Sequence, residues 1–158
     1  MSTCARATRR GPAGFTLAEL LIVLVIVAIA LSMAVPKLNA FLQVNAVQGA
    51  LNRVATDLNL ARVRALTTSR QVRLTVAADG GSYTVVVDPA GAAPVTYKTV
   101  RLTQDFPGVD LTPHSTAITF DSRGMATGAN GTTTLTATKQ GKSGTLTVSG
   151  VGRIYRGY

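Results

Sequence analysis

Several residue types are scarce in this chain of 158 residues, and each scarcity excludes a class of protein. The single cysteine, Cys4, excludes an internal disulfide and a zinc site built from cysteines. The single histidine, His114, argues against a histidine-ligated metal centre, so we expect no metal and no other cofactor. Only 7 acidic residues accompany 16 lysines and arginines, which gives a net charge of +9. This surplus favours acidic partners such as nucleic acid or anionic lipid.

Charge is also missing from a long stretch near the N-terminus. Glu19 is the only charged residue between Phe15 and Val35. A helix of this length spans about 30 Å, the thickness of the hydrocarbon core of a bilayer. Three arginines and no acidic residue precede it. By the positive-inside rule we expect a single-pass protein with a cytoplasmic N-terminus and the remainder across the membrane.

Three interpretations of this stretch compete. A secretory signal peptide would be cut near the small residues 32–34, but the apolar run is longer than a usual signal core. The arginine pair at positions 9 and 10 fits a twin-arginine signal poorly. An unprocessed membrane anchor is the second interpretation. The third depends on a short motif where the run begins.

This motif, Gly-Phe-Thr-Leu-Ala-Glu at residues 14–19, resembles the processing site of type IV pilins and type II secretion pseudopilins. The resemblance implies that a prepilin peptidase removes the leader 1–14 by cutting after Gly14 and methylates the new terminal residue, Phe15. Glu19 then becomes the fifth mature residue, which implies a role in assembly, and Pro36 the twenty-second. We adopt this interpretation because the motif, the proline and the apolar run agree in register.

The carboxylate of Glu19 can be interpreted from its position as well. A charged group at the edge of a bilayer is costly and usually has a partner. Cleavage after Gly14 would place the cationic amine of Phe15 in the same layer. Glu19 can pair with that amine within one chain or with the amine of a neighbouring chain. The resemblance implies pairing between chains, which would offset a desolvation cost of several kcal/mol per ion.

Processing would change the composition of the mature chain. Removal of residues 1–14 takes away the only cysteine and lowers the side-chain charge from +9 to +6. The exported part would therefore fold without disulfides. Many major pilins carry a C-terminal disulfide loop, so this difference favours a minor subunit.

Helical periodicity continues beyond Pro36. Apolar residues recur at spacings of three and four on one face, namely at Val44, Val47, Leu51, Val54, Leu58, Ala61 and Ala65. We predict one helix from about Phe15 to Ser69, with a kink or break at Pro36. Its segment 15–37 would be the transmembrane or filament-core half. Its segment 38–70 would be periplasmic and pack on the sheet of the same chain.

From Gln71 onward the period changes to two, which indicates strands. We expect strands at 72–76, 83–87, 97–103 and 117–120, and a hairpin of 132–139 and 145–149 around a turn at 140–144. Residues 128–131 are typical of a loop. The predicted fold is α+β and type IV pilin-like. A long N-terminal transmembrane helix continues into a globular head of antiparallel β-sheet at residues 71–158.

Two segments of the head narrow the resemblance. Residues 118–126, Ile-Thr-Phe-Asp-Ser-Arg-Gly-Met-Ala, and Gly152-Arg153 after a threonine-rich hairpin resemble the GspH/FimT family of minor pseudopilins and minor pilins. Membership implies an inner-membrane subunit near the tip of a periplasmic pseudopilus, assembled with other minor and major pseudopilins for protein secretion. The alternative is a FimT-like minor pilin of a type IV pilus that binds DNA for natural transformation.

No arrangement for catalysis is visible in the sequence. His114 falls in a loop without a nucleophile or carboxylate at a useful spacing. Aspartates lie near turns, where their side chains bond to local backbone, at positions 79, 88, 105, 110 and 121. We therefore expect a protein that is not an enzyme and has no catalytic residues.

Basic residues gather in two places, at the end of the helix and at the C-terminus. The first group is Arg62, Arg64, Arg70 and Arg73. After Asp121 there is no acidic residue, and tyrosines lie among the basic ones. The candidate DNA-binding residues are Lys139, Lys142, Arg153, Tyr155 and Arg156. An ordinary solvated surface is the alternative interpretation.

The sequence of the C-terminus differs from that of DNA-binding pilins. DNA-binding FimT-like pilins carry a C-terminal Gly-Arg-x-Arg, whereas residues 152–156 here read Gly-Arg-Ile-Tyr-Arg. The second arginine is one residue late. In an extended strand Arg153 and Tyr155 point one way and Arg156 points the other. A two-arginine clamp would then need a bulge or a free chain end.

Overall fold

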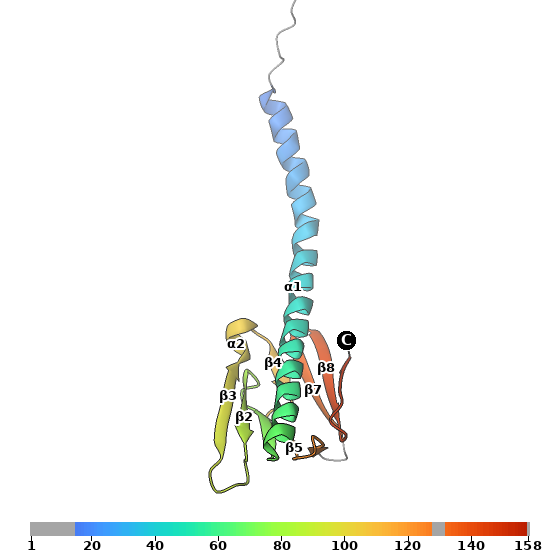
Figure 1. The fold of residues 1–158 in the computed structure, drawn as a ribbon. Coiled ribbons are helices and arrows are strands. Elements are labelled where there is room, and N and C mark those ends of the chain that lie inside the picture. The colour runs from blue at the N-terminus through green and yellow to red at the C-terminus, as the bar shows by residue number, and fades with distance from the viewer. Residues whose placement is uncertain (1–14, 128–131, 158) are drawn as a thin grey trace, which may run out of the picture. The chain divides into compact units, whose positions relative to one another are not determined.

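The computed structural model describes residues 15–127 and 132–157. The chain divides into two compact units, Met1–Asn39 and Ala40–Tyr158. Helix α1, Leu17–Thr68, belongs to both units (Figure 1). Its ends agree with the predicted helix to within two residues. It continues without interruption through Pro36, so the predicted break is wrong, and a kink at this residue stays a prediction.

In the first unit, the described part of α1 exposes its side chains on all sides. Its leucines, isoleucines and valines are about half exposed or more, with Leu21 at 54% and Ile22 at 61%. The helix is long and apolar enough to cross a membrane. A helix that is apolar all round needs lipid or other helices around it, because water solvates this surface poorly.

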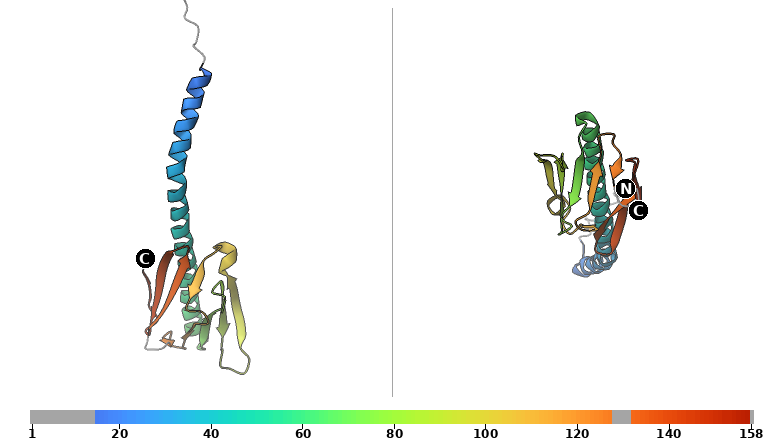
Figure 2. Two further views of the ribbon diagram at one scale, coloured as in Figure 1. Left: turned by 180° about the vertical axis from the view of Figure 1, so that it is seen from behind. Right: turned by 90° about the horizontal axis from the view of Figure 1, so that it is seen from below.

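In the second unit, α1 buries one stripe against the strands. The buried residues are Val47, Ala50, Leu51, Val54, Ala55, Asp57, Leu58, Ala61 and Ala65. The predicted stripe is confirmed except at Val44, which is only half-buried. Figure 1 shows this part of α1 in front of the strands, and the view from behind in Figure 2 shows the strands in front of the helix. The head is therefore a helix layer on a strand layer.

The strand layer consists of two antiparallel sheets. The five-stranded sheet has the order β3-β2-β1-β5-β6. Its strands are β1 Val72–Val76, β2 Ser82–Val87, β3 Val95–Arg101, β5 Ala117–Phe120 and β6 Ala126–Thr127. The four-stranded sheet has the order β4-β7-β8-β9. Its strands are β4 Asp110–Thr112, β7 Thr132–Lys139, β8 Lys142–Ser149 and β9 Ile154–Gly157.

The sequence prediction differs from these sheets in several elements. The strand expected at 97–103 ends at Arg101, where the short helix α2, Leu102–Asp105, begins. The hairpin turn is only Gln140-Gly141, with φ of 45° and 80°, as the twist of a two-residue hairpin demands. Strands β4, β6 and β9 were not predicted, because each has only two to four residues and shows no clear alternation. The expected loop at 128–131 lies outside the described residues.

Candidate assembly site

The N-terminus of α1 is closed by a reciprocal pair of hydrogen bonds. The backbone N–H of Glu19 donates to Thr16 Oγ1 at 3.2 Å, and the backbone N–H of Thr16 donates to Glu19 Oε2 at 3.4 Å. This is a capping box, in which each of two backbone N–H groups without a helical partner donates to the side-chain oxygen of the other residue. The sequence signal is Thr-x-x-Glu at residues 16–19, and a capping box was not among the predictions. Glu19 therefore has a local structural role besides the predicted role in assembly.

The predicted processing site lies next to this cap. Gly14 is outside the described residues, and Phe15 is 80% exposed immediately before the cap. Cleavage after Gly14 would leave the amine of Phe15 one residue from Thr16, whose N–H already contacts the Glu19 carboxylate. Within one chain the amine of Phe15 would therefore lie close to the Glu19 carboxylate, and pairing between chains stays a prediction.

In the head, Asp57 is buried on α1 and is 3% exposed. Tyr83 of β2 donates its hydroxyl to Asp57 Oδ2 at 2.6 Å, and the Lys98 ammonium of β3 lies 2.7 Å from Oδ1. Arg53 Nε is 3.8 Å from Oδ2. These contacts tie α1 to the five-stranded sheet. The sequence signal is a charged residue three positions after Val54 of the apolar stripe, and Asp57 was not among the predicted site residues.

The environment of Tyr83 follows from the same contacts. Burial disfavours the phenolate, and the hydrogen bond to Asp57 and the negative charge of this carboxylate disfavour it further. Together they hold the pKa of Tyr83 well above its ordinary value. The hydroxyl stays protonated and remains a donor to Asp57.

The candidate DNA-binding residues of the C-terminal region do not converge. Lys139 and Lys142 pair across the tip of the β7–β8 hairpin, where Gln43 of α1 contacts Gln140. Arg153 follows the other end of β8, which is about 23 Å away at 3.3 Å per residue. The two lysines and the arginine therefore lie at opposite ends of the four-stranded sheet.

Strand β9 also separates its own residues. Leu146 and Val148 of β8 are buried under α1, and they are opposite Arg156 and Ile154. Arg156 Nη1 donates to Asn52 Oδ1 of α1. Tyr155 is on the other face, opposite Thr147, and is 52% exposed. Tyr155 and Arg156 therefore lie on opposite faces of β9, as expected for neighbouring residues of a strand.

The four basic residues near the end of α1 disperse as well. The Arg64 guanidinium lies 3.8 Å above the ring of Tyr97, and Arg70 pairs with Asp88 at 3.3 Å. Arg73 Nε donates to Thr119 Oγ1. The fourth residue, Arg62, bonds to loop carbonyls. Residues close in sequence thus contact different strands and loops.

The prediction for His114 is wrong in one respect. His114 Nε2 lies 3.1 Å from Asp110 Oδ1, so a carboxylate does accompany the histidine. Both side chains are 44% exposed. Within the described ranges 15–127 and 132–157, no group of three or more histidine, cysteine, aspartate or glutamate side chains could hold a metal ion.

Comparison with known families assigns the chain. The model described as "Type II transport protein GspH" matches residues 50–152, more than half of the chain. The chain belongs to the GspH family. A second model, the prokaryotic N-terminal methylation motif, matches residues 9–35 and implies processing by a prepilin peptidase. No curated protein matches the chain significantly. Members of this family are structural subunits of type II secretion pseudopili or type IV pili.

Solved structures show the same fold. The type IV minor pilin FimU of Pseudomonas aeruginosa is 20% identical, with a TM-score of 0.57 over 70% of this chain and 87% of FimU. The minor pseudopilin EpsH from the type 2 secretion system of Vibrio cholerae is 14% identical, with a TM-score of 0.55 over 70% of this chain and 94% of EpsH. The type IV pilin-like fold is thus confirmed, and the apolar helix and the methylation motif fit a protein anchored in the inner membrane.

The two head segments that resemble the GspH family meet in the structure. Arg62 of α1 donates Nε to the carbonyl of Gly124 and Nη2 to the carbonyl of Val151. Gly152 has a φ of +75°, and a Cβ there would meet the Gly124 carbonyl oxygen. Only glycine fits this close approach. The β5–β6 turn and the β8–β9 turn are thereby held at α1.

Proposed function

We propose that this chain is a minor pseudopilin of a type II protein secretion system, a structural subunit near the tip of the periplasmic pseudopilus. The GspH match over residues 50–152 carries the proposal. The exposed apolar part of α1 supports it, because a surface of this kind suits first a membrane and then the core of a filament. The N-terminus would be cytoplasmic and the head periplasmic.

The N-terminal residues take specific roles in this proposal. The prepilin peptidase cuts after Gly14 and methylates Phe15, and the methylation-motif match over residues 9–35 supports this. Glu19 then pairs with the amine of Phe15 of a neighbouring major or minor pseudopilin. The helix has two functional halves, a membrane half at 15–37 and a periplasmic half at 38–70. The globular head at 71–158 follows the helix.

The alternative is a FimT-like minor pilin that binds DNA for transformation, and the exposed arginine at position 153 favours it. Against it stands the placement of the other candidates. Arg156 is tied to Asn52, and Lys139 and Lys142 lie at the far end of the sheet. A strand of nucleic acid would find no common groove along these side chains.

A DNA titration tests the choice between the two functions. We expect the chain, purified in a non-ionic detergent, to show no micromolar affinity for single- or double-stranded DNA at physiological salt. Any residual binding should fall only slightly in the Arg153→Ala/Arg156→Ala variant, because Arg156 is already bonded to Asn52 and the two arginines form no common site. Fluorescence anisotropy at several salt concentrations would measure both.

The salt dependence of binding shows which result would contradict this expectation. A DNA site built on a few arginines loses affinity with a log–log slope of about −0.7 to −0.9 per phosphate contact. Micromolar binding whose slope falls by about two contacts in the double variant would assign the chain to DNA uptake.

A further inference from the structure

A groove runs along the exposed side of α1, between this helix and β3, the edge strand of the five-stranded sheet. It consists of two adjoining cavities of about 490 and 350 Å³, which share Leu60. We call it the α1–β3 groove, and the residues that matter here are Gly49, Arg53, Leu60, Arg64, Tyr97 and Phe106. From Gly49 to Arg64 the helix rises about 22 Å at 1.5 Å per residue. An extended segment of about seven residues would match this length.

A β-bulge shapes the wall of the groove. Val85 is opposite Lys98 and Val86 is opposite Thr96, so Tyr97 is an extra residue in β3. Two consecutive side chains that would alternate in a regular strand therefore both reach α1. Lys98 reaches Asp57, and the ring of Tyr97 lies under the Arg64 guanidinium. Bulges occur at sheet edges and next to functional sites, where they re-aim side chains, and this one aims two neighbouring side chains at the groove.

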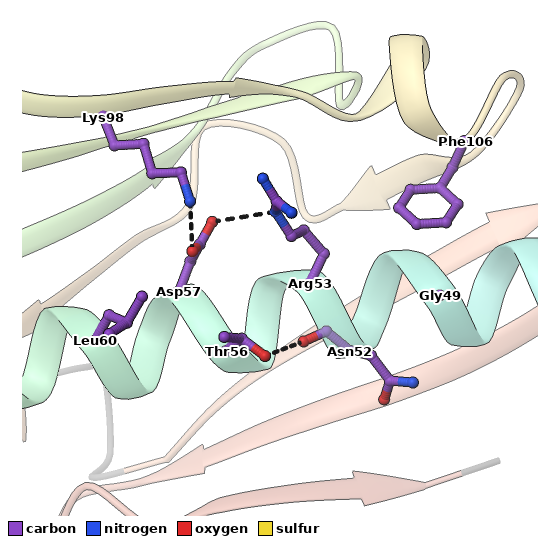
Figure 3. Close-up of a pocket in the computed structure, with 8 residues that line it drawn as sticks. All are labelled: Gly49, Asn52, Arg53, Thr56, Asp57, Leu60, Lys98 and Phe106. Carbon is purple, nitrogen blue, oxygen red and sulfur yellow. Dashed lines mark hydrogen bonds and ion pairs between the residues drawn. The ribbon is translucent and has the colours of Figure 1, made fainter.

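The end of the groove depends on a glycine. A Cβ at Gly49 would lie 2.5 Å from Cε1 of Phe106, which follows α2. The bare backbone at this position lets the aromatic ring rest on the helix. Figure 3 shows Phe106 above Gly49 at one end of the groove and Leu60 at the other, with Arg53 between them.

The charges of the groove leave a surplus of positive charge. The carboxylate of Asp57 is buried and is bonded by Tyr83 and Lys98. Arg53 reaches it only through Nε at 3.8 Å, beyond hydrogen-bonding distance, and its side chain is 46% exposed. The Nε of Arg64 is buried and out of reach of a ligand, but the residue is only half-buried and lines the groove, so an acidic group can approach its guanidinium at the Nη atoms. Two guanidinium groups therefore retain donors for an acidic ligand.

The groove is also apolar at the positions between these arginines. Leu60 is 51% exposed and Tyr97 is 48% exposed, and Val63 beside them is 54% exposed. Apolar side chains gathered on one exposed surface and flanked by charge are typical of a protein interface. A bare phosphate would leave this apolar surface in water, whereas a peptide would cover it.

We propose that the α1–β3 groove binds an extended segment of a neighbouring filament subunit that carries carboxylates between apolar side chains. The carboxylates pair with Arg53 and Arg64, for which a bidentate geometry is favourable. The apolar side chains cover Leu60, Val63 and Tyr97. The identity of the partner as a filament subunit rests on the proposed function, but the chemistry of the groove does not.

Peptide binding to the full-length chain in non-ionic detergent tests the groove directly. The probe is a fluorescent seven-residue peptide that alternates leucine and glutamate, and its matched control replaces each glutamate by lysine. We expect the acidic peptide to bind and the basic one not to bind. Arg53→Gln should weaken binding by about tenfold, the scale of one lost charged hydrogen bond. Leu60→Ser should weaken it as well, and Arg123→Gln, an exposed arginine outside the groove, should leave it unchanged.

Each remaining outcome would overturn the proposal. Equal affinity in Arg53→Gln and the unmodified chain would place the peptide elsewhere. Binding of the basic peptide would show that charge does not select the ligand, and displacement by oligothymidine at equal concentration would indicate a nucleic-acid groove. Thermal unfolding of each variant checks that the head remains folded. This assay uses no filament, so its failure would not bear on the proposed role of Glu19 in assembly. Likewise, the incorporation of Glu19 variants into filaments does not test the groove.

Discussion

Replacement of Glu19 by alanine is expected to give a chain that is processed and held in the membrane but is absent from filaments. The apolar run of α1 is unchanged by this substitution, so insertion should proceed as before. The buried amine of the neighbouring Phe15 would lose its counter-charge, and an uncompensated charge among packed helices costs several kcal/mol. Sheared filaments and membrane fractions, probed with an antibody to the head, would show the distribution. A Gly14→Glu chain, which should not be cleaved, marks the size of the precursor.

The glutamine variant separates the charge of Glu19 from its helix cap. Glutamine can still accept the Thr16 N–H and complete a capping box, but it carries no charge. We therefore expect Glu19→Gln to be excluded from filaments as fully as Glu19→Ala. Normal incorporation of Glu19→Gln would show that the cap is the essential feature, and it would refute charge pairing between subunits.

Replacement of Asp57 by alanine is expected to lower the free energy of unfolding of the head by about 3 kcal/mol. The substitution leaves the hydroxyl of Tyr83 without its 2.6 Å acceptor and Lys98 without its 2.7 Å partner. This loss is at the lower end of the range for breaking a buried ion pair, because the Lys98 side chain is 32% exposed and stays partly hydrated. Circular dichroism should show a fall in Tm of about 10 °C.

A surface ion pair provides the matched control. Arg70 and Asp88 are 3.3 Å apart, but their side chains are 62% and 31% exposed. Arg70→Gln should therefore change stability by less than about 1 kcal/mol. If Arg70→Gln and Asp57→Ala lowered Tm equally, the buried cluster would not be what holds α1 to the five-stranded sheet.

The long periodic elements could be predicted from the sequence. The helix and the buried stripe with Val47, Leu51 and Val54 follow a period that many residues repeat, so a single exception does not obscure it. The alternation in β1 was equally clear, and β2 alternates until its last three residues, which are all valine. The division into two sheets was not predictable, because it depends on strand pairings far apart in sequence, such as Val72 with Phe120 in one sheet and Leu111 with Ala137 in the other.

The candidate sites were predictable only where the signal is local. The motif at residues 14–19 lies in one continuous segment, and the family match over 9–35 agrees with it. The C-terminal basic residues are close in sequence, but a strand of eight residues and a change of face separate them in space. The α1–β3 groove depends on the bulge at Tyr97, and the sequence alternation around this residue does not reveal it.

The most direct test of the account is deletion of the gene in its own host, with two readouts in the same strain. One is the amount of secreted protein that reaches the medium, and the other is the frequency of natural transformation. The account predicts a loss of secretion that the intact gene restores, with transformation unchanged. Normal secretion together with a loss of transformation would contradict it and assign the chain to a type IV pilus.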